Sequence, residues 1–199
     1  MSDKFMTKLH NTNTPHNWFR TSYLWITNSK YRTKKYLQEF VLEQVTDPIQ
    51  QIALKHLITR FKRFKSDDTK IVAIQNWVIN HISYVTDQTK YGMVERWESP
   101  LEVYKSMKGD CESQAILIYC LARWSGIIDL KLWMVIGPTR SDYHCWLRYL
   151  STVSDEWFSI DTTYHPNVDA LSVRGCYGLD YKYKGEDAVF NETGAYVYQ

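Results

Sequence analysis

Apolar residues recur at helical spacing in the first part of the chain. The period begins near residue 36, restarts after Asp47-Pro48, where a proline suits the first position of a helix, and restarts again after Ser66, a residue type that caps helices. The apolar positions of these three expected helices are Leu37, Phe40, Val41, Val45, Ile49, Ile52, Ala53, Leu57, Phe61, Phe64, Ile71, Ile74, Trp77, Val78 and Ile82. Residues 1–35 show no clear period, so we expect an extended or loosely ordered arm there.

The pattern changes in the second part of the chain. Residues 111–124 (CESQAILIYCLARW) are apolar nearly all round, which predicts a buried helix that ends at Gly126. Shorter apolar or alternating segments over 131–138, 144–151 and 156–164 predict strands. Helices followed by consecutive strands are typical of an α+β fold with an antiparallel sheet.

The region between these parts, residues 84–109, is predicted to be loop-like. Its one exception is a short helical turn around residues 101–107, introduced by Ser99-Pro100. We expect two parts in the whole chain: a basic N-terminal arm with a helical extension over residues 1–66, and a core over residues 67–199.

The composition is that of an ordinary folded protein, but the charge is unevenly distributed. Apolar residues make up 44% and charged residues 23%, which excludes a chain too polar to form a core. Residues 1–66 hold 12 basic and 4 acidic residues, whereas residues 67–199 hold 12 basic and 18 acidic ones. The basic part is interpreted as a docking surface for an acidic partner or as a solvated helical face.

Nucleic acid and membranes are not expected partners. Basic and aromatic residues are interleaved over residues 18–36, which suits single-stranded nucleic acid, but no known binding motif accompanies them. No apolar run reaches the roughly 18–20 residues of a membrane helix, and the polar start lacks a secretory signal. We therefore expect a cytoplasmic protein, with association with a virion as an alternative.

Three residues of the predicted core could form one catalytic site. Cys111 follows a Gly-Asp turn at the start of the buried helix, where the helix dipole favours a thiolate. A four-residue turn at 152–155 would pair Trp146 with Asp161, and a two-residue turn would pair His144 with Asp161. Either register keeps His144 and Asp161 on one face, close enough for the carboxylate to orient the imidazole. The arrangement is that of a nucleophile, a base and an orienting acid.

Four short segments carry a family resemblance. They are Trp97-Glu98-Ser99-Pro100-Leu101-Glu102, Gly109-Asp110-Cys111-Glu112-Ser113-Gln114, His144-Cys145-Trp146-Leu147 and Ile160-Asp161-Thr162-Thr163-Tyr164. In this order and spacing, roughly residues 67–165 resemble the transglutaminase-like superfamily of papain-like thiol enzymes, especially its compact bacterial and phage branch. The resemblance implies a core helix that bears the nucleophile, packed on an antiparallel sheet that bears the histidine and the aspartate.

The resemblance also implies roles for individual residues. Cys111 would be the nucleophile, His144 the general base and then acid, and Asp161 the residue that orients the imidazole. Trp97 matches the family's tryptophan ahead of the cysteine loop. Trp97 and Trp146 are expected to anchor that loop or to line the substrate groove.

Asp110 and Glu112 match the acidic pair that flanks the family's cysteine, where some bacterial relatives bind calcium. Two carboxylates underfill a calcium site, which takes 6–8 oxygen ligands. We therefore expect no cofactor, with calcium at Asp110 and Glu112 as the alternative and helix capping as the simplest interpretation.

One donor of the oxyanion hole is expected to be the backbone amide of Cys111, because it lies at a helix start. The second donor is not assigned. Gln114 lies one turn inside the helix and could be structural instead, and Tyr84 and Tyr91 are loop candidates without a spacing argument.

The implied function is thiol-dependent acyl transfer at amide bonds of a protein or peptide, through a thioester. A cysteine peptidase or amidase is preferred because the chain lacks the extra domains of the large cross-linking enzymes, an argument by analogy. The alternatives are a cross-linking transglutaminase, in which an amine resolves the thioester, and a non-catalytic structural or binding protein, such as a virion component, that retains the fold.

Overall fold

The computed structural model describes residues 30–93, 96–139, 143–163 and 186–197. The helices are α3 (Lys30–Thr46), α4 (Pro48–Ala53), α5 (Lys55–Lys62), α6 (Asp67–His81), α7 (Asp87–Tyr91), α8 (Pro100–Ser106), α9 (Cys111–Trp124) and the 3-10 turn η1 (Asp129–Lys131). The strands are β1 (Ser83–Tyr84), β2 (Lys108–Gly109), β3 (Leu132–Pro138), β4 (Tyr143–Leu150), β5 (Trp157–Ile160), β6 (Ala188–Phe190) and β7 (Ala195–Val197). Residues 1–29 of the arm predicted over residues 1–35, and the stretch 164–185, lie outside the described residues.

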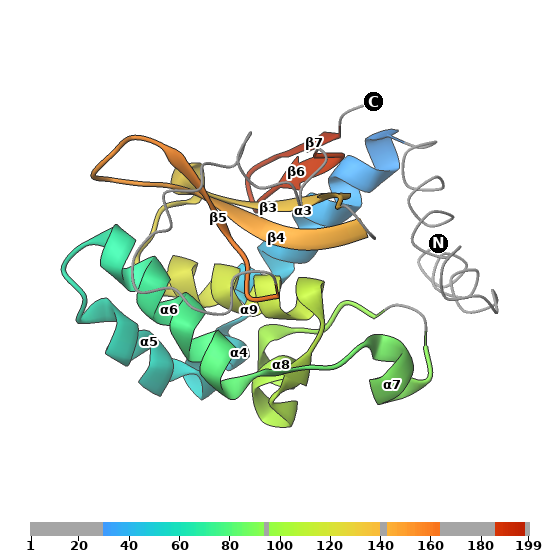
Figure 1. Ribbon diagram of the computed structural model, residues 1–199, viewed down its shortest axis with the longest axis horizontal. Coiled ribbons are helices and arrows are strands. Elements are labelled where there is room, and N and C mark those ends of the chain that lie inside the picture. The colour runs from blue at the N-terminus through green and yellow to red at the C-terminus, as the bar shows by residue number, and fades with distance from the viewer. Residues whose placement is uncertain (1–29, 94–95, 140–142, 164–185, 198–199) are drawn as a thin grey trace.

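Strands β3 to β7 form an antiparallel sheet in the order β5-β4-β3-β6-β7, and β1 and β2 form a separate short parallel pair. The sheet is one layer and α9 lies against it, with α4, α5, α6 and α8 beyond α9 (Figure 1). The predicted α+β class is therefore confirmed. The C-terminal residues complete the sheet, because β6 pairs with β3 and β7 with β6.

The predicted buried helix is α9, with the predicted bounds. Nearly all of its residues are buried, because helices pack against several of its sides and the sheet covers another. Gly126 follows it with a φ of 102°, a left-handed conformation that favours glycine, and Ile127 N–H bonds back to Ala122 O at 3.1 Å. This helix end is the predicted one.

The N-terminal caps of the earlier helices follow the sequence signals. Asp47 accepts a hydrogen bond from Ile49 N–H at 2.8 Å at the start of α4, and Ser66 accepts one from Thr69 N–H at 3.2 Å at the start of α6. The helix predicted to begin near residue 36 begins earlier, at Lys30.

The expectation that Ile49 and Ile52 belong to the core is wrong. Both side chains are exposed, at 70% and 74%. The predicted helix over residues 48–64 is divided at Leu54 into α4 and α5, so the spacing of three and four does not continue across the break. Gln50 is the buried residue of α4; its side chain donates to Gln44 and accepts from Leu101 N–H.

The core between α9 and the sheet includes residues from both predicted parts of the chain. Leu37, Val41 and Phe61 share a cluster with Leu117 and Leu147. The division of the chain into residues 1–66 and 67–199 stays a prediction. In the part of the chain that the structure describes, no helix has both the length and the apolar character needed to cross a membrane.

Candidate active site

His144 and Asp161 meet at one end of the sheet. Strand β5 pairs with β4 so that Leu147 faces Ile160, which is the register predicted for a four-residue turn. This places Asp161 diagonally across from His144, and His144 Nε2 lies 2.8 Å from Asp161 Oδ2. Both residues are only 3% exposed, so the pair is shielded from water.

Neighbouring groups hold the imidazole of His144 and the carboxylate of Asp161 in place. The imidazole of His144 stacks on Trp146, with centroids 6.1 Å apart and planes 15° from parallel. Asp161 Oδ1 accepts a hydrogen bond from Thr163 N–H at 2.8 Å. Trp146 therefore supports the imidazole from its own strand, a contact that differs from both roles expected for it, and those roles stay predictions.

Cys111 is the first residue of α9 and is buried, with 7% of its surface exposed. Its Sγ donates to Glu112 Oε2 at 3.1 Å, and within the described residues no hydrogen bond joins the thiol to His144. The helix packs against β4, which carries His144. The structure thus assembles the histidine–aspartate pair and places the cysteine on the neighbouring helix, with its proton directed to a carboxylate.

The thiol of Cys111 is held in its protonated form. Burial raises its pKa well above the ordinary value, and the negative charges of Glu112 and Asp110 raise it further. The sequence position at a helix N-terminus predicted a lowered pKa, so the direction is opposite to the expectation. Burial and two adjacent carboxylates, which the position in the sequence does not reveal, account for the raised pKa.

Trp97 contacts two distant parts of the chain. Its ring packs edge-on against Phe40 of α3 with centroids 5.0 Å apart, and against Phe190 of β6 at 6.1 Å. These contacts fix the segment before α8 to the helical layer and the sheet at once. They support the anchoring role rather than the lining of a groove.

Glu98 is a site residue that the sequence reasoning missed. Its side chain is fully buried and accepts hydrogen bonds from Lys90 Nζ at 2.7 Å, from Tyr91 Oη at 2.5 Å and from Ser113 Oγ at 3.1 Å. Ser113 lies in the first turn of α9, so Glu98 ties the loop and α7 to the nucleophile helix. Because Tyr91 donates to Glu98, its hydroxyl hydrogen is already engaged and it is a poor candidate for the second oxyanion donor.

Two buried glutamines hold the ends of the site. Gln75 of α6 donates from Nε2 to the backbone carbonyl of Asp161 at 3.0 Å. Gln114 donates from Nε2 to Gly109 O at 3.1 Å and accepts from Thr162 Oγ1 at 2.5 Å. Both polar ends of Gln114 are therefore engaged, which favours the structural alternative for this residue over an oxyanion donor.

Asp87, Asp110 and Glu112 converge beside the cysteine. Each offers a carboxylate oxygen within 4.8 Å of the others, and all three residues are buried. Among the described residues, Oδ1 of Asp87 and Oδ1 of Asp110 have no hydrogen-bond partner, and the Asp110 side chain makes no capping bond to α9.

This convergence of carboxylates is electrostatically unfavourable without a counter-charge. Burial and the neighbouring charge of Asp110 raise the pKa of Asp87 to about 7. The three acids have the chemistry of a hard-cation site, because hard cations take carboxylate oxygens. Asp87 was missed by the sequence reasoning, since it lies far from the cysteine motif, in the region predicted to be loop-like.

Residues 55–162, more than half of the chain, match the family described as the Transglutaminase-like superfamily. The chain belongs to the transglutaminase-like superfamily. The resemblance read from the four sequence segments is confirmed. Membership of the transglutaminase-like superfamily supports a thiol enzyme in general terms.

Solved structures of LapG from Legionella pneumophila share the fold. The EGTA-treated form aligns over 82% of this chain and 84% of its own, with a TM-score of 0.57 and 21% identity. The calcium-bound form aligns over 74% of this chain and 77% of its own, with a TM-score of 0.55 and 23% identity. No curated protein is significantly similar to the chain in sequence.

Proposed function

We propose that this transglutaminase-like protein is a cysteine peptidase or amidase, with Cys111 as nucleophile, His144 as base and acid, and Asp161 as the residue that orients the imidazole. The observation that carries the proposal is the buried 2.8 Å hydrogen bond between His144 and Asp161, on a strand against which the Cys111 helix packs. An imidazole oriented by a carboxylate, close to a cysteine, is the arrangement that thiol acyl transfer uses.

The two ring nitrogens of His144 have different roles in this proposal. Nε2 of His144 donates to Asp161, so Nδ1 is the nitrogen that exchanges a proton with the thiol and the leaving amine. In the first half-reaction, Sγ of Cys111 loses its proton to Nδ1 and bonds to the carbonyl carbon. The C–N bond then breaks as Nδ1 returns the proton to the amine, leaving a thioester.

Water completes the reaction in the second half. Nδ1 of His144 takes a proton from water, and the water oxygen bonds to the thioester carbon. The C–S bond then breaks as Nδ1 gives that proton to Sγ of Cys111, which leaves a carboxylic acid and the free thiol. In this proposal the backbone amide of Cys111, at the start of α9, donates to the developing oxyanion.

The three converging acids support calcium as a cofactor. Asp87, Asp110 and Glu112 would hold the ion, with two unpartnered buried carboxylate oxygens as the structural argument for the fit. When bound, calcium would neutralise the carboxylates that raise the pKa of Cys111 and compete with the thiol for Glu112. The calcium-bound form of LapG is a precedent in a protein with the same fold.

A peptide library tests the reaction. Peptides with blocked amino groups are incubated with the protein in calcium chloride, with and without biotinylated pentylamine, and the products are identified by mass spectrometry. We expect new carboxyl termini in both samples, no product from Cys111→Ala, and retained product from Cys120→Ala, which alters a cysteine on the same helix outside the site. Pentylamine incorporated in excess of acid would assign cross-linking activity instead, and no product above the Cys111→Ala level would support a binding protein.

A further inference from the structure

The two halves of the candidate site lie on different elements, and one side chain connects them. Cys111 lies on α9, whereas Asp161 follows β5, and Gln114 of α9 bonds to the residue next to Asp161. The amide of Gln114 is oriented without ambiguity, because the carbonyl of Gly109 only accepts a hydrogen bond, so Nε2 must face it. Oε1 is then left to accept from the hydroxyl of Thr162.

Each partner of Gln114 is one or two residues from a residue of the proposed catalytic triad. Gly109 lies two residues before Cys111, and its backbone is confined because an added Cβ would lie 2.8 Å from the Cβ of Ser113. Thr162 directly follows Asp161, whose backbone carbonyl is held from the other side by Gln75. Displacement of the Gln114–Thr162 bond would therefore move the aspartate relative to the thiol helix.

We propose that Gln114 and Thr162 are positioning residues that set the distance between the Cys111 thiol and the His144–Asp161 pair. This inference rests on the proposed function. Gln114 is 3% exposed. Its amide donates to the carbonyl of Gly109 and accepts from the hydroxyl of Thr162, and the side chains of leucine, methionine or ionised glutamate cannot do both. Thr162 acts through its hydroxyl and does not itself contact the reacting atoms.

Adjacent threonines offer a matched test. Thr162→Val removes the hydroxyl that donates to Gln114 and keeps the side-chain shape. Thr163→Val makes the same change one residue later, where the hydroxyl has no hydrogen-bond partner among the described residues and the backbone N–H that binds Asp161 is retained. Thr162→Ser keeps the hydroxyl and serves as the conservative rescue.

The experiment measures, by peptide mass spectrometry, the rate at which iodoacetamide alkylates Cys111 in calcium chloride. The melting temperature of each variant is measured as well. His144→Ala is the reference for a lost base. We expect Thr162→Val to slow alkylation about tenfold or more, since a misplacement of about 1 Å can cost about 100-fold. Thr162→Ser and Thr163→Val should react at close to the wild-type rate, with all melting temperatures similar.

The outcomes separate this inference from the proposed function. If His144→Ala slows alkylation but Thr162→Val does not, the positioning role is wrong and the proposed catalytic pair stands. If His144→Ala has no effect, the proposed function fails, and the positioning role fails with it. Equal losses in Thr162→Val and Thr163→Val would show a general loosening of the loop and would also overturn the inference. Gln114→Met, which removes both hydrogen bonds, gives a second test if Thr162→Val fails to fold.

Discussion

Nε2 of His144 lies 2.8 Å from Oδ2 of Asp161, and the two residues are among the most buried polar groups of the sheet. The carboxylate accepts the hydrogen of Nε2, so it selects the tautomer in which Nδ1 is the basic nitrogen. A hydrogen bond of this kind sets both the orientation and the protonation pattern of the ring.

The first prediction concerns this tautomer. In the neutral ring of His144 we expect the proton on Nε2, visible in nitrogen-15 NMR as a protonated Nε2 and an unprotonated Nδ1, with the signals assigned by their loss in His144→Ala. Asp161→Ala should mix the tautomers and lower peptide turnover by about 10²- to 10⁴-fold, the usual contribution of a positioned base. A proton found on Nδ1 in the wild-type protein would contradict the assigned roles.

Calcium should stabilise the protein through the three converging acids. At a calcium concentration of about 100 times the Kd, binding contributes about 2.7 kcal/mol. For a protein of this size that raises the melting temperature by roughly 5–10 °C. Asp87→Asn, which removes a charge from the cluster, should lose most of this increase. Asp155→Asn changes an exposed acid in the turn between β4 and β5 and should keep it.

Scanning calorimetry with calcium chloride, magnesium chloride or EGTA provides the measurement. A shift of the same size in Asp87→Asn and in the wild-type protein would place the bound ion elsewhere. The absence of any shift in the wild-type protein would rule out calcium at this cluster. Neither result depends on enzymatic activity, so the cofactor is tested independently of the reaction.

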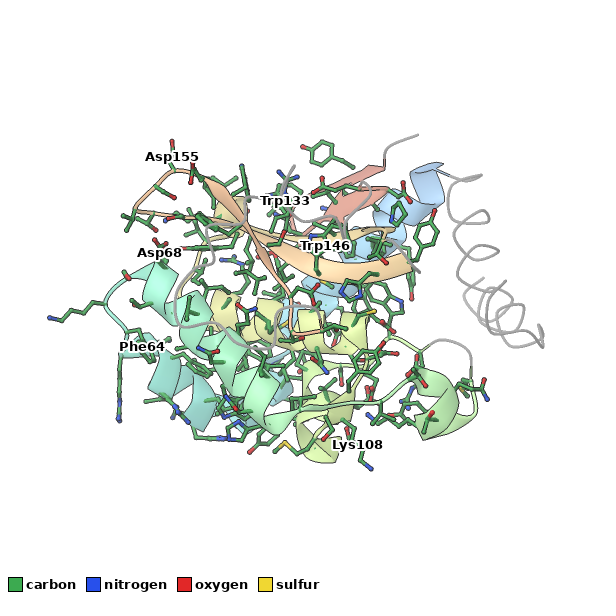
Figure 2. The ribbon with its side chains drawn as sticks, in the orientation of Figure 1. Phe64, Asp68, Lys108, Trp133, Trp146 and Asp155 are labelled. Carbon is green, nitrogen blue, oxygen red and sulfur yellow. The ribbon has the colours of Figure 1, made fainter. Side chains whose placement is uncertain are left out.

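The hydrogen bonds of Asp68 predict how the free energy of unfolding depends on pH. Figure 2 shows Asp68 at the N-terminal end of α6, below the hairpin that carries Asp155. Asp68 accepts hydrogen bonds from Tyr149 Oη at 2.6 Å and from Ser151 Oγ at 2.8 Å. Burial acts to raise the pKa of Asp68, but these bonds and two from the backbone amides of Thr152 and Val153 outweigh it and hold the pKa below 3.8.

A carboxyl group with a lowered folded-state pKa contributes stability above its ordinary pKa, and this contribution is lost as the pH falls through the folded value. Asp68→Asn should therefore cost about 2 kcal/mol in the free energy of unfolding near pH 7. The difference from the wild-type protein should shrink below about pH 4. Urea unfolding measures it, with Glu156→Gln as an exposed control on the same hairpin. A difference that stays constant with pH would show that the charge of Asp68 is not responsible.

Gly109 makes a steric prediction at the start of the nucleophile helix. A Cβ on Gly109 would lie 2.8 Å from the Cβ of Ser113, closer than two such atoms approach. Gly109→Ala should cost about 1–3 kcal/mol, as overpacking usually does. At Gly194 a Cβ would meet Trp133 at an ordinary 3.8 Å, so Gly194→Ala is the control and should be nearly neutral. Equal effects in thermal unfolding would contradict the close approach.

Sequence reasoning succeeded where the signal is local. An apolar run closed by Gly126 defines α9, and the length of the turn at 152–155 sets the register that brings Asp161 towards His144. Both features depend on residues within a few positions of one another. The candidate site was predicted from them together with the family segments.

The features that were missed depend on packing between distant segments. Asp87 comes close to Asp110 because β1, which precedes α7, pairs with β2, which precedes α9. Glu98 accepts from two residues of α7 and from Ser113 of α9. A carboxylate in a loop-like stretch carries no sequence signal of such neighbours. The lowered pKa expected for Cys111 failed for the same reason, since burial and nearby charge are tertiary properties.

The helix break at Leu54 leads to a last prediction, which tests the corrected face of α4. Ile52 lies at a spacing that suits the core but is 74% exposed, whereas Leu57 of α5 is 4% exposed. Ile52→Ser should change the free energy of unfolding by no more than about 0.5 kcal/mol, as exposed substitutions usually do. Leu57→Ala should cost about 2–5 kcal/mol, because it leaves a cavity in the core. Urea unfolding of both variants measures these free energies. If only Leu57→Ala is costly, the break at Leu54 and the exposed position of Ile52 are supported. If Ile52→Ser is equally costly, Ile52 is buried and the corrected face of α4 is wrong.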